Sequence, residues 1–76
     1  MMRLPSRLVV EKLEKAYPPG TRVELLYMED PQAPPRGTKG TVLMVDDIGT
    51  IHVRWDNGSG LGFAYGQDSI RKIQKY

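Results

Sequence analysis

Hydrophobic and polar residues alternate along residues 22–27 and 50–55, and this alternation predicts two β-strands. The apolar face of the two strands consists of Val23, Leu25, Tyr27, Ile51, Val53 and Trp55. His52 and Arg54 fall on the opposite face of the second strand. Because successive side chains of a strand point to opposite faces, each strand should have one buried and one exposed face.

Shorter apolar runs predict three further strands, over residues 40–45, 61–65 and 70–73. A tight connection at 46–49 joins the first of these to the strand at 50–55. Asn57-Gly58 then predicts a type I′ hairpin turn, because both residue types tolerate the positive φ that this turn requires.

A helix is predicted over residues 6–16, where Ser6 is the expected N-cap and Pro18-Pro19 ends the helix. Its expected apolar face is Leu8, Val9, Leu13 and Ala16. A type II turn over 18–21, with Gly20 at positive φ, should lead from the helix into the first strand. So short a helix is marginal alone, so we favour a lid packed on the sheet over a surface that docks a partner.

The longest predicted loop spans residues 29–39 and contains three prolines. Such a loop serves either as a functional surface or as a structural crossover, and both readings stay open. No internal repeat is apparent in the sequence.

This order of elements is that of an SH3-like barrel, so the expected fold is mainly β. We predict a small five-stranded SH3-like barrel over residues 21–74 with an N-terminal α-helix over 6–16, in a single domain over 1–76. The predicted core consists of Val23, Leu25, Val42, Met44, Ile51, Val53, Trp55, Leu61, Phe63, Ile70 and Ile73.

Composition limits the possible functions mainly by excluding certain kinds of site. The chain has 76 residues, no cysteine and one histidine, so neither a disulfide nor a Cys- or His-based metal site is expected. The lack of cysteine fits a cytoplasmic protein. We expect no targeting segment and no membrane contact, since no apolar run approaches the roughly 18 residues that a span needs.

No catalytic constellation is recognisable, so we expect no enzyme and no cofactor. His52 lies within a predicted strand, and the serines lack a neighbouring base. Asp46-Asp47 lacks the further ligands of a cation site, and the glycines of 58–62 lack the context of a phosphate loop.

Two kinds of partner remain, a protein or a nucleic acid, and the protein is slightly favoured. Basic side chains could contact phosphates, but the net charge of +2 is weak and acidic residues in the neighbouring loops oppose such binding. A groove formed by aromatic residues and the acidic start of the long loop could instead hold a protein, with the chain a monomer or a weak homodimer. The candidate binding residues are Glu29, Asp30, Arg36, Lys39, His52, Arg54, Trp55, Asp56 and Tyr65.

Several segments together resemble one known family. They are Tyr17–Leu25, Met28–Pro31, Pro35–Val42, Val45–Val53, Trp55–Gly58 and Gly66–Asp68. In combination they resemble the domain of unknown function 4314 family, short proteins of bacteria, phages and other mobile elements. The resemblance supplies no activity and no catalytic residues. It implies a mobile-element origin, and hence a small protein that binds a host or element protein, such as an inhibitor of a host defence factor.

Overall fold

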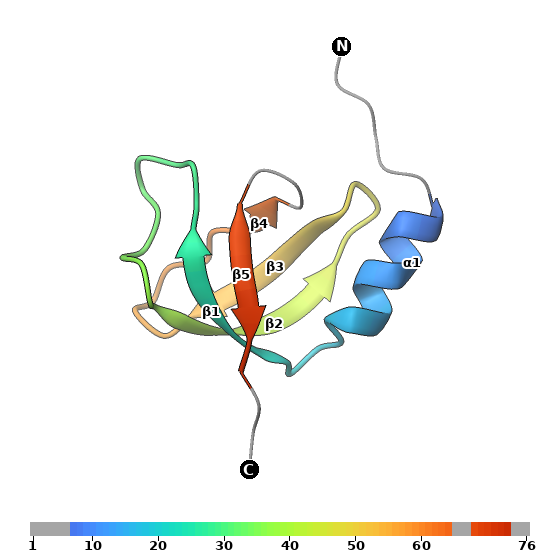
Figure 1. Cartoon of the computed structure of the whole chain (residues 1–76), viewed down its shortest axis with the longest axis horizontal. Coiled ribbons are helices and arrows are strands. Elements are labelled where there is room, and N and C mark those ends of the chain that lie inside the picture. The colour runs from blue at the N-terminus through green and yellow to red at the C-terminus, as the bar shows by residue number, and fades with distance from the viewer. Residues whose placement is uncertain (1–6, 65–67, 74–76) are drawn as a thin grey trace.

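The computed structural model describes residues 7–64 and 68–73 and contains one helix and five strands (Figure 1). The elements are α1 (Arg7–Ala16), β1 (Arg22–Tyr27), β2 (Lys39–Val45), β3 (Thr50–Trp55), β4 (Phe63–Ala64) and β5 (Ser69–Lys72). The strands predicted over 22–27 and 50–55 are confirmed to the residue, whereas β4 is shorter than predicted. The predicted cap at Ser6 and the predicted binding residue Tyr65 lie outside the described residues.

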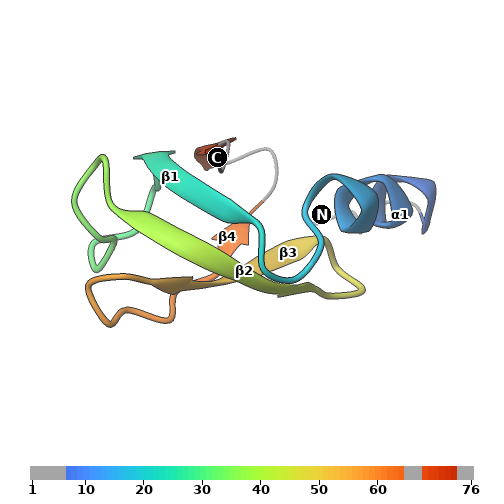
Figure 2. The same ribbon diagram turned by 90° about the horizontal axis from the view of Figure 1, so that it is seen from below.

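The strands form one antiparallel sheet in the order β4-β3-β2-β1-β5. Figures 1 and 2 show this sheet as strongly curved, with α1 to one side, close to the end of β2. The two edges are β4 and β5, and no pair between them is formed among the residues described. The fold is therefore mainly β with an N-terminal helix, as predicted, and its sheet is open.

The core lies between the inner face of the sheet and α1. Its buried residues are Val10, Leu13, Val23, Leu25, Met28, Val42, Val45, Ile51, Val53 and Trp55. Of the other predicted core positions, Leu61, Ile70 and Ile73 are half-buried, and the Phe63 side chain lies outside the described residues.

The helix packs on the sheet, as predicted, and Leu13 and Val9 of the predicted face contact the core, but Val10 takes the place predicted for Leu8. Val10 and Leu13 are buried in the core cluster, whereas Leu8, which was predicted to face inward, is 69% exposed. Lys72 of β5 fixes the end of the helix, since its Nζ donates to the Ala16 carbonyl at 2.8 Å. A cation at this position also interacts favourably with the negative end of the helix dipole.

Two β-bulges overturn the predicted orientation of two side chains. The pairing register shifts between Leu25 and Tyr27 in β1, and between Val42 and Met44 in β2. Tyr27 and Met44, which alternation placed inside, are therefore about half exposed. The extra residue in each bulge shifts the inward–outward alternation by one position, so Met28 and Val45 are buried in place of Tyr27 and Met44.

The two bulged strands belong to an internal repeat, so the expectation of no repeat is wrong. Residues 18–30 (PPGTRVELLYMED) align with residues 35–47 (PRGTKGTVLMVDD) at an offset of 17. Both copies begin with a turn closed by a Thr amide on a Pro carbonyl, at 3.1 Å and 3.0 Å. The carbonyl of Thr21 then accepts from the Val42 amide, and the carbonyl of Thr38 accepts from the Leu25 amide, both at 2.8 Å. Because β1 and β2 pair with each other, the copies are related by an approximate two-fold axis.

The turn after β3 differs from the predicted type I′ turn. The Gly58 amide donates to the Trp55 carbonyl at 2.9 Å, and the Trp55 amide donates to the Ser59 carbonyl at 2.9 Å. Within the described ranges only glycines have positive φ, so Asn57 does not adopt the left-handed conformation that type I′ demands. This is a type I turn followed by a bulge, in which Gly58 alone takes φ of 93°.

Candidate functional site

A cluster of polar side chains lies on the outer face of the sheet, opposite the core. We call it the outer polar surface, and it consists of Arg22, Glu24, Lys39, Thr41, Arg54, Asp56 and Arg71. Strand pairing sets these residues in two rows, since Arg71, Glu24 and Lys39 are cross-strand neighbours, as are Arg22, Thr41 and Arg54. With four cations and two carboxylates, the surface carries an excess of positive charge.

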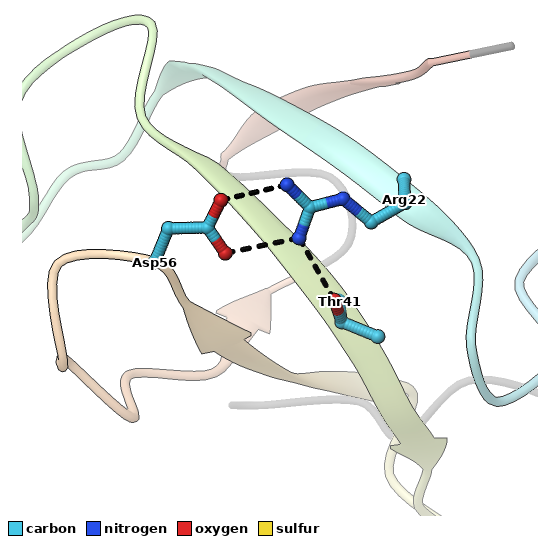
Figure 3. Close-up of polar contacts among 3 residues, drawn as sticks. All are labelled: Arg22, Thr41 and Asp56. Atoms are coloured by element: carbon cyan, nitrogen blue, oxygen red, sulfur yellow. Dashed lines mark hydrogen bonds and ion pairs between the residues drawn. The ribbon is translucent and has the colours of Figure 1, made fainter. Parts of the chain in front are cut away.

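Arg22 and Asp56 form the strongest contact of this surface (Figure 3). The two terminal nitrogens of Arg22 donate to the two carboxylate oxygens of Asp56 at 2.9 Å and 2.6 Å, and Nη1 also donates to Thr41 Oγ1 at 2.9 Å. The hydrogen bond from Arg22 holds the pKa of Asp56 below its ordinary value. The same bond raises the pKa of Arg22. Such a two-point contact fixes the turn after β3 against β1 and β2.

A second ion pair joins β5 to β1 on the same surface. Arg71 Nε donates to Glu24 Oε1 at 2.7 Å, and only about a fifth of the Glu24 side chain is exposed. Lys39 lies opposite Glu24 on β2 and also lowers the pKa of Asp56 through its charge. The acids of the outer polar surface are thus held by its own cations.

His52 lies next to this surface, where it pairs with Asp46 of the β2–β3 turn. Its Nε2 is 2.8 Å from Asp46 Oδ2, while Asp46 Oδ1 accepts from the amides of Thr50 and Ile48 at 2.9 Å and 3.1 Å. Partial burial acts to raise the pKa of Asp46, but the bonds from His52, Thr50 and Ile48 outweigh it and leave that pKa lowered. His52 therefore helps to order this turn, and the contact with Asp46 occupies its Nε2.

Trp55 was predicted to line the binding rim, and this prediction is wrong. Its side chain is 1% exposed, and its Nε1 donates to the Leu61 carbonyl at 2.9 Å. A buried indole with its N–H satisfied serves packing, not recognition. Tyr65, predicted beside it, lies outside the described residues.

Glu29, Asp30 and Arg36 lie in the long loop between β1 and β2, and all three are exposed. Asp30 orders this loop by accepting from the Gln32 amide at 2.8 Å. A shallow hollow of about 200 Å³ separates the loop from β1 and is lined by Leu25, Leu26, Tyr27, Met28, Ala33, Pro34 and Arg36. Arg36 therefore borders this hollow, whereas Glu29 and Asp30 are not among its lining residues.

Of the nine predicted binding residues, the outer polar surface brings together Lys39, Arg54 and Asp56. Sequence reasoning missed Arg22 and Glu24 as members, although alternation had already placed both on the outer side of the first strand. Their partners were not predictable in this way, because Arg22 meets Asp56 across 34 positions of the chain. Only the pairing of the strands shows which outward residues become neighbours.

The described part of the chain offers little support for metal chemistry. No group of three or more His, Cys, Asp or Glu side chains comes together there to hold a metal ion. Nor does any helix in that part have the length and apolarity needed to cross a membrane. What the outer polar surface can do is form ion pairs and hydrogen bonds.

Comparison with known families places the chain beside one of unknown function. The family described as domain of unknown function (DUF4314) matches residues 6–73, which is nearly the whole chain. Comparison with curated proteins and with solved structures gives no match in either case.

Proposed function

The chain belongs to the domain of unknown function (DUF4314) family, and we propose that it is a non-catalytic module that binds a protein partner. One observation carries this proposal, namely the large apolar side chains exposed at the β2 bulge and the turn that follows it. These are Leu43, Met44 and Ile48, each between 48% and 56% exposed. Leu26 and Tyr27 are exposed at the β1 bulge, at the other end of the β1–β2 pair. Neighbouring exposed apolar residues are typical of surfaces that bind other proteins.

The proposal extends to the kind of fold and the setting. The strand order β4-β3-β2-β1-β5 and the long loop after β1 support an SH3-like barrel. The likeness of the sequence to short phage and mobile-element proteins supports a partner from the host or the element, with inhibition of a host defence factor as one such role. The lack of cysteine supports a cytoplasmic location.

Affinity capture with matched variants tests the protein-binding proposal. We expect tagged wild-type protein to retain a bacterial protein that Leu43→Glu fails to retain, because a charge at the bulge disrupts an apolar contact. Leu8→Glu is the control, since Leu8 is also an exposed leucine but lies on α1. Capture of nothing above background, or equal capture by both variants, would count against the proposal.

Nucleic-acid binding is a second candidate, favoured by the four cations on one face of the sheet. Arg54 is exposed there, and among the described residues it has no carboxylate partner. A mobility-shift titration at low salt with single-stranded DNA, duplex DNA and RNA decides the matter. No shift at roughly 10–50 μM protein would remove this candidate, because phosphate contacts are strongest at low salt.

A further inference from the structure

The approximate two-fold axis that relates β1 and β2 also makes Arg71 of β5 and Arg54 of β3 equivalent. The β2–β3 pair reproduces the β1–β5 pair, since Thr41 lies opposite Arg54 as Glu24 lies opposite Arg71. The two arginines thus occupy the same place in two copies of one arrangement. They differ in what the facing strand offers them.

Arg71 has a carboxylate partner within the chain, and Arg54 does not. Glu24 accepts from Arg71 Nε at 2.7 Å, but the residue facing Arg54 is Thr41, whose hydroxyl already accepts from Arg22 at 2.9 Å. Asp56, two residues from Arg54, has both oxygens occupied by Arg22. Within the described ranges, Arg54 is therefore an exposed cation without a facing carboxylate, whereas its equivalent Arg71 faces Glu24.

We propose that Arg54 receives a carboxylate from the protein partner, in the position that Glu24 fills for Arg71. Leu43 and Met44 follow Thr41 on β2 and are each about half exposed. The segment that fits this surface therefore presents a Glu or Asp side chain flanked by apolar residues. This inference rests on the proposed protein-binding function and adds the chemistry of the partner.

The surroundings of Arg54 favour a protein carboxylate over a chain of phosphates. Asp56 and Glu24 share the outer polar surface, and Asp46 and Asp47 lie in the next turn along β2. These acids repel a continuous polyanion but tolerate one carboxylate placed at Arg54. The apolar pair Leu43 and Met44 likewise offers nothing to a sugar-phosphate backbone.

The test uses three labelled probes of similar length in fluorescence anisotropy. They are a peptide containing Glu and Leu, the same peptide with Gln in place of Glu, and oligothymidylate. We expect the wild-type protein to prefer the Glu/Leu peptide and Arg54→Gln to weaken its binding about tenfold, the effect of losing one charge-assisted contact. Arg71→Gln is the matched control, because it removes the same charge from a cation that is already paired, and it should weaken binding by less than about threefold.

A second variant installs the missing acid. Thr41→Glu places a carboxylate opposite Arg54, as in the other copy, and should abolish binding of the Glu/Leu peptide while far-UV circular dichroism stays unchanged. Equal losses in Arg54→Gln and Arg71→Gln, tighter binding of oligothymidylate, or no binding of the Glu/Leu peptide would each overturn the inference. The proposed function would still stand or fall separately, on the capture experiment with Leu43→Glu.

Discussion

Gly40 lies where β2 passes closest to the core side chains of β3. A Cβ at this position would lie 2.6 Å from Val53 Cγ1 and 2.8 Å from Trp55 Cε3. In the other copy of the repeat the equivalent residue is Val23, which is fully buried. The difference has a physical reason, because Trp55 occupies the room above Gly40, whereas Val23 lies opposite Lys72.

We therefore expect Gly40→Ala to lower the free energy of unfolding by about 1–3 kcal/mol, the usual cost of overpacking a core. Urea denaturation followed by circular dichroism measures this change. Gly60→Ala is the control, since a Cβ there meets no atom within 4 Å, and its effect should stay within about 0.5 kcal/mol. Equal destabilisation by the two variants would contradict the assigned packing.

Asp46 links the stability of the chain to pH. Its folded-state pKa lies below the unfolded value of about 3.9, so its ionised form is favoured by folding. This contribution is fully present above the unfolded pKa and is lost as the pH falls through the folded pKa. We expect Asp46→Asn to flatten the fall in unfolding free energy below about pH 4. Urea titrations at several pH values test this, and an equally steep fall in Asp46→Asn and the wild type would contradict it.

The helix α1 illustrates how an element can be predicted correctly while its packing is not. Its existence followed from apolar spacing, and its end followed from Pro18-Pro19. Its buried face could not be read as well, because Leu8, Val9 and Val10 are consecutive apolar residues that fit several helical faces. Contact with the sheet selects Val10 and Leu13.

For this helix we expect Leu13→Ala to cost about 2–3 kcal/mol of unfolding free energy, as for other truncated core leucines. Leu8→Ala should change it by less than about 0.5 kcal/mol, because Leu8 is exposed. Thermal unfolding of the two variants under identical conditions provides the measurement. A larger effect of Leu8→Ala would mean that the helix packs with its other face.

The strands show where alternation succeeds and where it fails. Alternation located β1 and β3 to the residue. It predicted that Tyr27 and Met44 face the core, which is wrong, because a bulge cannot be recognised from the sequence of its own strand. The turn at Asn57-Gly58 was misassigned for a related reason. Asn-Gly fits a type I′ turn, in which both residues are left-handed, and equally a type I turn with a bulge, in which only the glycine is left-handed, so the sequence does not distinguish the two.

The molecule as a whole has a single core to which α1 and the sheet both contribute. Its Cα radius of gyration is 11.9 Å, close to the roughly 11 Å of an ordinary folded domain of this length. The class of fold could be predicted from sequence because it depends on local patterns. The outer polar surface could not, because its pairs depend on which strands become neighbours.

A shared core predicts that helix and sheet unfold together. Trp55 is the one tryptophan of the chain and is buried, so its fluorescence reports on the core, whereas far-UV circular dichroism reports on α1 as well. We expect the two signals to give the same urea midpoint, as in two-state unfolding of a small domain. Separate midpoints would show that α1 detaches before the sheet unfolds.

The offset of 17 residues gives this chain an alignment with itself. Positions that agree between the copies, such as Gly20 with Gly37 and Leu26 with Leu43, mark what the architecture dictates. Positions that differ reflect either different packing, as at Val23 and Gly40, or the different use that we propose for Glu24 and Thr41. A library of substitutions scored in both copies would therefore separate requirements of folding from requirements of binding, with each half serving as the reference for the other.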